Sequence, residues 1–385
     1  MNETSLNQHL TQAIATYHGF LPFPAFMQAA LYHQSHGYYQ QKNRVFGAEG
    51  DFITGAEMGP WLALAFADLI HHHWQQWGCP ERWSLLEQGG GRGRLLGQVL
   101  RLLRDHFQQL PTQVFAVEQS PLRQAEQAEH YREHQLEVSI LPSLNAVQHD
   151  GPLLVFSNEL PDAFPVCCFV WQQGRAYERG VAVDETGALY WAIAEQAMAP
   201  QPAIDATISA AWSDGYISEL NHGLEAWQSE LAALLSKHGG MVITVDYGYS
   251  QQEYYRANRL EGTLMGHAAH QTVYDVLANP GASDITAHID FTALARCGRK
   301  HGLQPVAYMT QGAWLACSPL LQATMQDCAA TPNARTVALL AHAKRLMLPH
   351  AGMGETFKLL VQSRDALALP PQLQSMNRLE RLHLG

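Results

Sequence analysis

The sequence predicts an α/β protein with a parallel sheet covered by helices, and two features carry this prediction. From residue 83 onward, short apolar runs alternate with amphipathic helical stretches, which is typical of a parallel sheet with helices on both faces. The runs are continuously apolar, as expected of strands that are buried on both sides. A glycine-rich stretch, EQGGGRG at 87–93, joins the first run to the first helical stretch.

Five strands are expected in the first part of this sheet, at residues 83–88, 113–118, 138–141, 152–157 and 241–247. A helix is expected from about Gly93 to Phe107, because the leucine, valine and phenylalanine positions of this stretch form one apolar stripe. The unit of strand, glycine loop, helix and strand is Rossmann-like. Two late strands are expected at 303–310 and 355–363, with a helical insertion at about 311–350 between them.

A β-rich insertion is expected after the fourth strand. Turn signals at Gln173-Gly174 and Glu185-Thr186-Gly187 separate three β-like runs, which predicts an antiparallel meander. A crossover helix is expected over 217–240, where Gly239 and Gly240 are C-cap signals.

Four parts of the chain follow from these elements. Residues 1–80 are expected to form a helical N-terminal segment with an aromatic, glycine-rich lid loop. Residues 81–159 and 236–363 form the core, residues 160–235 contain the meander and the crossover helix, and residues 364–385 form a C-terminal tail.

Composition excludes several classes of protein. The formal net charge of -11 argues against non-specific binding to nucleic acid or to anionic membranes, and favours a basic partner. No apolar run is long enough to span a membrane, and the N-terminus lacks a signal-peptide pattern, so a cytoplasmic location is expected. The three consecutive histidines His71, His72 and His73 point in different directions on a helix, so no metal site is expected there.

The glycine loop does not match the patterns that bind phosphate groups. In G-x-G-x-x-G the third glycine allows close helix packing, but here that position is Arg94 or Leu96, depending on the first glycine counted. No Gly-Lys pair of a P-loop follows a strand either. The spacing is instead Glu87 followed by Gly89, Gly91 and Gly93. A carboxylate there would repel a pyrophosphate, but it suits a cationic, phosphate-free nucleoside such as S-adenosylmethionine.

Glu118, at the end of the second strand, is expected to accept hydrogen bonds from both ribose hydroxyls. Dinucleotide-binding enzymes use the same device, so Glu118 does not discriminate between cofactors by itself. The residues alone therefore favour a methyltransferase. Another Rossmann-like enzyme, or a purely structural glycine loop, stays open.

Eight ordered stretches together resemble one family. They are ALYHQSHGYYQ, GDFITGAEMGP, LLEQGGGRG, VEQSPLRQAEQ, SNELPDAFPV, VITVDYGY, DITAHIDFTAL and MGETFKLL. The resemblance, over about residues 23–362, is to the MidA-like S-adenosylmethionine-dependent methyltransferases, whose mitochondrial members are complex I assembly factors that methylate a protein arginine. It implies a class I methyltransferase fold, with a seven-stranded sheet whose last strand is reversed. The chain departs from the family pattern at Gln88, Gly90, residues 55–59 and Leu160-Pro161.

The stretch SNELPDAFP supplies the candidate catalytic residues. An arginine is protonated at neutral pH, so its methylation needs carboxylates that orient the guanidinium. Glu159 and Asp162 directly follow the fourth strand, at the carboxyl edge where ligands bind in this architecture. Asn158 is expected to meet the amino-acid end of the cofactor. For Asp162, an N-cap of the following turn is an equal alternative.

Further candidates lie at other strand ends and in the N-terminal loop. Asp246 and Tyr247, which end the fifth strand, and His288 are expected near the substrate, although a structural histidine is an equal alternative at 288. Asp51 and Thr54 are expected to fold over the cofactor, unless they form a simple turn.

The expected partner is a protein substrate that presents an arginine, and a homodimer stays open. Two other functions remain compatible with the sequence. One is methylation of a small molecule, because residues 249–287 diverge from the family pattern. The other is a chaperone-like assembly factor that binds the cofactor without essential catalysis.

Overall fold

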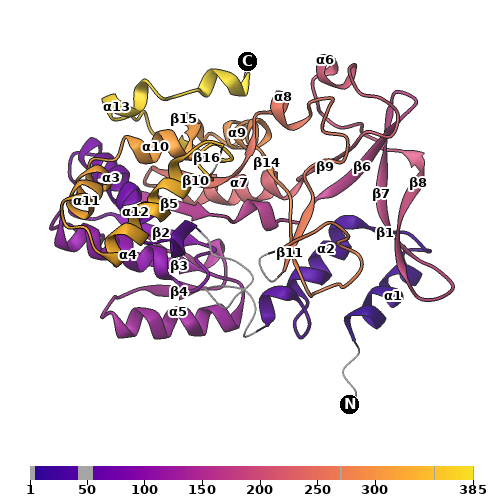
Figure 1. Cartoon of the computed structure of the whole chain (residues 1–385), viewed down its shortest axis with the longest axis horizontal. Coiled ribbons are helices and arrows are strands. Elements are labelled where there is room, and N and C mark those ends of the chain that lie inside the picture. The colour runs from indigo at the N-terminus through magenta and orange to yellow at the C-terminus, as the bar shows by residue number, and fades with distance from the viewer. Residues whose placement is uncertain (1–4, 42–54, 269–270, 351, 385) are drawn as a thin grey trace. The chain divides into compact units, whose positions relative to one another are not determined.

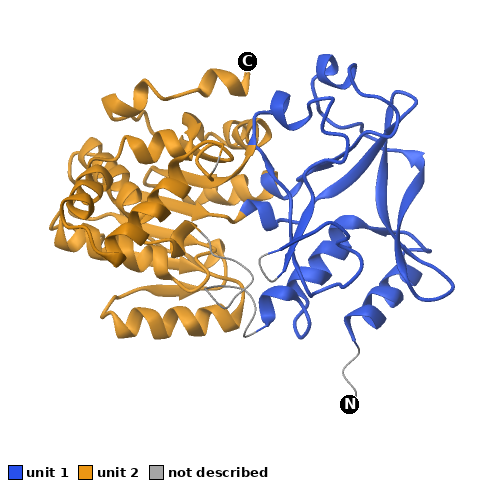
Figure 2. Ribbon diagram, viewed as in Figure 1, with its two compact units in different colours: residues 1–52, 161–224, 249–290 blue, residues 53–160, 225–248, 291–385 orange. Residues whose placement is uncertain are grey.

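A computed structural model describes residues 5–41, 55–268, 271–350 and 352–384 of the chain. Figure 1 shows its helices and strands. The chain forms two compact units, coloured separately in Figure 2. The first unit contains residues 1–52, 161–224 and 249–290, and the second contains residues 53–160, 225–248 and 291–385.

The second unit contains the central sheet. The strands that this unit contributes to the eight-stranded sheet are β2 (Ser84–Gln88), β3 (Gln113–Val117), β4 (Ser139–Leu141), β5 (Leu153–Asn158), β10 (Gly240–Tyr249), β15 (Gln304–Thr310) and β16 (Phe357–Ser363). They follow the order β15-β16-β10-β5-β2-β3-β4. The pairs from β10 to β4 are parallel, whereas β16 runs antiparallel to both β10 and β15. The expected α/β fold and the expected reversed late strand are confirmed.

Helices pack around this sheet. They are α3 (Trp61–Gln76), α4 (Arg94–Asp105), α5 (Pro121–Glu133), α7 (Gly223–Leu234), α9 (Phe291–Lys300), α10 (Gln311–Ala316), α11 (Pro319–Ala330) and α12 (Ala334–Met347). The helix α3 packs against α4, α10 and α11, and α9 packs on β15 and β16. Phe66 of α3 has its ring 4.9 Å from the rings of both Phe156 and Trp314, in the interior of the unit. The tail contains a short helix, α13 (Pro371–Gln374).

The expected boundary at residue 80 separates α3 from this core, whereas the structure places α3 inside it. The reason is that α3 is apolar on most of its surface: nine of the ten residues from Trp61 to Ile70 are buried, so the helix needs cover on several sides.

The first unit combines N-terminal helices with the β-rich insertion. Its helices are α1 (Leu6–Thr16), α2 (Phe23–Tyr32), α6 (Ala206–Ser209) and α8 (Gln251–Tyr254). Its strands are β1 (Leu21–Pro22), β6 (Cys167–Gln172), β7 (Arg175–Val183), β8 (Leu189–Ala197), β9 (Ile217–Leu220), β11 (Met265–Ala268), β12 (Gln271–Val273), β13 (Asp284–Thr286) and β14 (Ile289–Asp290). The strands β6, β7 and β8 form the expected meander, with β1 and β9 completing the sheet.

The expected crossover helix over 217–240 is wrong at its start. Residues Ile217–Leu220 form β9, which pairs antiparallel with β6 so that Cys167 lies opposite Leu220. The helix α7 begins only at Gly223, where the Asn221 side chain accepts a hydrogen bond from the Gly223 N–H at 3.1 Å. A free strand edge on β6 therefore outweighs the local helical pattern of these four residues.

Of the described helices, none is both long and apolar enough to cross a membrane.

Candidate active site at the carboxyl edge of the central sheet

The glycine loop joins β2 to α4 and has an unusual backbone. Gly89, Gly91 and Gly93 have φ angles of 71°, 54° and 74°, in the left-handed region that side chains disfavour. A Cβ atom on Gly93 would also come within 2.5 Å of the Tyr131 hydroxyl oxygen of α5. The three alternate glycines of the sequence are thus required by the path of the loop.

Gly90 has a different role, which concerns Glu87. A Cβ atom at position 90 would overlap with the Glu87 carboxylate, which folds under the loop. Glu87 is only 2% exposed, and its Oε2 atom has no hydrogen-bond partner among the described residues. Burial, and next the nearby negative charge of Glu118, raise the pKa of Glu87 to about 8, although a backbone hydrogen bond from Leu96 opposes the shift. The departure from the family pattern at Gly90 therefore makes room for this carboxylate.

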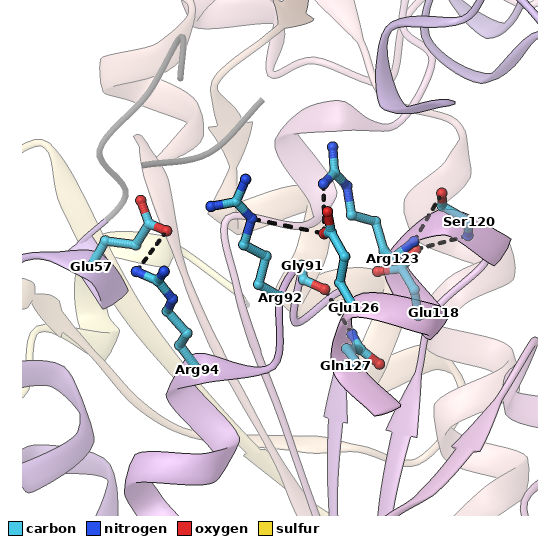
Figure 3. A network of polar contacts seen from close by, with 9 residues as sticks. All are labelled: Glu57, Gly91, Arg92, Arg94, Glu118, Ser120, Arg123, Glu126 and Gln127. Atoms are coloured by element: carbon cyan, nitrogen blue, oxygen red, sulfur yellow. Dashed lines mark hydrogen bonds and ion pairs between the residues drawn. The ribbon is translucent and has the colours of Figure 1, made fainter. Parts of the chain in front are cut away.

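Glu118 lies directly after β3, where its backbone N–H donates to the Leu141 carbonyl at 3.0 Å. Its Oε1 atom accepts a hydrogen bond from the Ser120 N–H at 2.9 Å, as Figure 3 shows. Burial raises the pKa of Glu118, whereas the Ser120 hydrogen bond and the positive charge of Arg123 oppose this shift. One carboxylate oxygen is thus fixed by the backbone.

The carboxylates of Glu87 and Glu118 and the hydroxyl of Tyr131 fit a cationic nucleoside. The unpaired Oε2 of Glu87 is a buried acceptor with a raised pKa, and a positive ligand would compensate for its charge. The hydroxyl of Tyr131 is likewise buried without a hydrogen-bond partner among the described residues, near Glu87 and Glu118. S-adenosylmethionine would be held here by Glu87 at its positive end and by Glu118 at its ribose.

Glu159 follows β5 and adopts a strained backbone conformation, with a φ of 52°. A non-glycine residue in this region costs free energy and persists only where its surroundings fix it. The backbone N–H of Glu159 donates to the Val245 carbonyl at 3.0 Å. Its Oε1 atom accepts hydrogen bonds from the Asn158 Nδ2 at 3.0 Å and from the Gly55 N–H at 3.4 Å. The structure thus brings Asn158 and Glu159 together at the edge of the sheet that carries the glycine loop.

The remaining candidates within the second unit are Asp246 and Tyr247, both in β10. Asp246 is fully buried and accepts a hydrogen bond from the Tyr247 N–H at 2.8 Å. The Tyr247 ring packs edge-on against Phe357 of β16, with 5.3 Å between the ring centroids. A role in binding substrate stays a prediction for both.

Asp162 and His288 belong to the first unit. Asp162 lies in a 3-10 turn (Pro161–Ala163), is 4% exposed, and accepts a hydrogen bond at its carbonyl oxygen from the Ala287 N–H. The His288 ring stacks on Tyr249 at 5.4 Å, and the backbone N–H of His288 donates to the Thr263 hydroxyl. Their catalytic and binding roles stay predictions. Asp51 and Thr54 lie outside the described residues.

Sequence reasoning missed a set of charged residues around the glycine loop (Figure 3). Arg94, in the position where dinucleotide folds have their third glycine, pairs with Glu57 at 3.4 Å. Glu126 of α5 pairs with Arg123 at 2.7 Å and with Arg92 at 3.7 Å. The i, i+3 spacing of Arg123 and Glu126 is the signal from which this one pair could have been predicted.

The three consecutive histidines do not form a metal site. His71 contacts Gln109 at 2.7 Å, and His72 contacts the Ala368 carbonyl at 3.2 Å. His73 is fully buried, and burial lowers its pKa to about 3. In the part of the chain that the structure describes, no group of three or more His, Cys, Asp or Glu residues could hold a metal ion.

Comparison with known proteins decides between the classes of enzyme that the sequence left open. The model of an S-adenosyl-L-methionine-dependent methyltransferase family matches residues 65–309, more than half of the chain. The chain belongs to this family. The structure of a Burkholderia thailandensis protein with bound S-adenosyl-homocysteine is similar to this chain. The two proteins are 26% identical, with a TM-score of 0.83, over 97% of this chain and 95% of that chain. The cofactor of this chain is therefore S-adenosylmethionine.

Two curated relatives are similar over nearly the whole chain. The protein arginine methyltransferase NDUFAF7 of Danio rerio is 26% identical, over 97% of this chain and 90% of its own length. The Drosophila melanogaster homologue of that protein is 25% identical, over 91% of this chain and 83% of its own length. Both relatives are mitochondrial.

Proposed function

We propose that this methyltransferase transfers the methyl group of S-adenosylmethionine to a nitrogen of an arginine in a protein substrate. The observation that carries the proposal is the position of Glu159 at the sheet edge that carries the glycine loop. Its backbone is strained, and its carboxylate is held by two hydrogen bonds. The relatives named protein arginine methyltransferases support the choice of acceptor. The net charge of -11 also favours a basic partner.

The bound cofactor supplies an electrophilic methyl group on a positive sulfur atom. The residues of this chain have two tasks in the reaction. First, the glycine loop, Glu87 and Glu118 fix the direction in which the methyl group faces, which is where positioning accelerates a displacement. Second, a carboxylate can accept hydrogen bonds from two guanidinium nitrogens, which turns the third nitrogen toward the methyl group.

Glu159 is suited to the second task. The Asn158 amide and the Gly55 N–H both donate to Oε1, so the carboxylate group is held in place. When the new N–CH₃ bond forms and the S–CH₃ bond breaks, S-adenosyl-homocysteine leaves, and the methylated nitrogen loses one proton to water.

The test is methylation of cell-lysate protein with isotopically labelled S-adenosylmethionine, followed by mass spectrometry of the labelled product. The proposal expects label on arginine of a protein.

The substitution Glu159→Gln preserves the shape of the side chain and an acceptor oxygen, so cofactor affinity should stay within about twofold while turnover falls by about 100-fold or more. Label found only in small metabolites, or normal turnover by the variant, contradicts the proposal. A partner that is captured equally well by a protein unable to bind cofactor would favour an assembly role.

A further inference from the structure

A cavity of about 450 Å³ lies in the second unit, among the helices α3, α10 and α11. Its wall also includes His106 and Phe107, which follow the end of α4. The glycine loop adjoins the start of α4, and this helix has 12 residues, so its far end lies about 18 Å from the loop. The cavity is therefore separate from the cofactor site, and its volume is that of pockets that bind small molecules.

One side of α3 supplies the polar part of the wall. The helix is otherwise apolar, but four of its polar residues line the cavity with the spacing i, i+3, i+4 and i+7, which places them along one side: Asp68, His71, His72 and Gln75. The last of the three consecutive histidines, His73, lies on another side of the helix and is fully buried. Two histidines of the motif that holds no metal thus line a cavity.

Two of these polar side chains have an acceptor atom that no described residue uses. Oδ2 of Asp68 accepts hydrogen bonds from the Ser318 hydroxyl and from the Leu320 N–H at 3.0 Å, whereas its Oδ1 has no hydrogen-bond partner among the described residues. Nδ1 of His71 contacts Oε1 of Gln109 at 2.7 Å. Because an amide oxygen only accepts, Nδ1 carries the proton, and Nε2 of the neutral ring is an acceptor.

The rest of the wall is mainly apolar. It includes Trp314 of α10, Leu373 of α13 and Phe107, whose ring stacks on His71 at 4.0 Å. Among the described residues that line the cavity, Asp68 is the only carboxylate, and none is a lysine or an arginine. A carboxylate beside apolar side chains is complementary to a ligand with a cationic nitrogen and an apolar body.

We propose that this cavity is a second ligand site, which binds a small organic amine whose apolar body lies against Trp314 and Phe107. The ammonium group of the ligand donates hydrogen bonds to Oδ1 of Asp68 and to Nε2 of His71. The site has no part in methyl transfer, and the glycine loop stays free to bind the cofactor.

The test is a titration of the full-length protein with tryptamine at about pH 8, with saturating S-adenosyl-homocysteine present, followed by NMR of the ligand. At this pH histidine side chains are ordinarily neutral, whereas aliphatic amines are protonated. Tryptophol, which has a hydroxyl group in place of the amine, is the matched neutral ligand. Tryptamine should bind with a Kd of about 1 mM or lower, and about tenfold or more tightly than tryptophol.

Two substitutions test the residues of the cavity. Asp68→Asn keeps an acceptor for the start of α11 but removes the charge, so the preference for tryptamine should shrink to about twofold or less. Ala323→Trp fills the cavity from an exposed position of α11, so both ligands should bind about tenfold or more weakly. The matched control Ala329→Trp alters an exposed position of the same helix away from the cavity, and both affinities should stay unchanged.

Three results would overturn the proposal. The first is no binding of tryptamine at concentrations up to about 10 mM. The second is equal affinity for tryptamine and tryptophol, or a full preference for tryptamine in a folded Asp68→Asn variant. The third is unchanged binding by Ala323→Trp, or competition between tryptamine and S-adenosyl-homocysteine, because either result would place the amine outside this cavity.

Discussion

The affinity for S-adenosylmethionine should rise with pH, because of the buried carboxylate of Glu87. In the protein without ligand its pKa is about 8, since burial disfavours the charged form. At neutral pH the carboxyl group is therefore mostly protonated, and binding of a cation next to it favours release of the proton. The ligand binds best to the ionised form, which becomes more abundant as the pH rises.

The size of the effect follows from the pKa. With a pKa of about 8, about 1% of the protein has Glu87 ionised at pH 6 and about half has it ionised at pH 8. If the ligand binds only the ionised form, affinity increases by about 50-fold over this range. At about pH 7, binding should release about 0.9 of a proton from Glu87.

Calorimetric titration in two buffers with different ionisation enthalpies measures this proton release directly. The control is Glu87→Gln, which has nearly the same shape and does not titrate. The amino group of the ligand titrates in both proteins, so the difference between them isolates Glu87. Equal proton release by the two proteins, or an affinity that falls as the pH rises, would refute this explanation.

Two further substitutions test the loop itself. Gly90→Ala places a methyl group where the Glu87 carboxylate lies, so cofactor affinity should fall by about tenfold or more; near-normal binding in a titration would show that Glu87 can move aside at little cost. Gln127→Leu removes the hydrogen bond of 3.0 Å from the Gln127 Nε2 to the Gly91 carbonyl, and should weaken cofactor binding by about fivefold. The thermal stability of this second variant, measured without ligand, separates a loosened loop from a general loss of folding.

The central sheet was largely predictable from the sequence, because its strands are short, continuously apolar and separated by clear helical stretches. The expected strand at 152–157, for example, forms at Leu153–Asn158, and all but its last residue are buried. The glycine loop was also predictable, since positive φ angles require glycine at alternate positions.

Other features depend on tertiary contacts that no local pattern records. Residues 217–220 form a strand because β6 offers them a partner, although the stretch continues into a helix. Arg123 lies in a helix of polar composition, where a charged residue is ordinarily solvent-exposed, and its burial depends on Glu126 and the nearby loop. The positive φ of Glu159 depends on β10, whose Val245 carbonyl accepts its N–H.

The most direct test of the proposed cofactor site is a crystal structure of this chain with S-adenosyl-homocysteine. Both ribose hydroxyls should lie within about 3 Å of the Glu118 carboxylate oxygens. The amino-acid end of the ligand should lie over the glycine loop, next to Glu87. A ligand bound elsewhere, or a ribose that contacts neither oxygen of Glu118, would contradict the account.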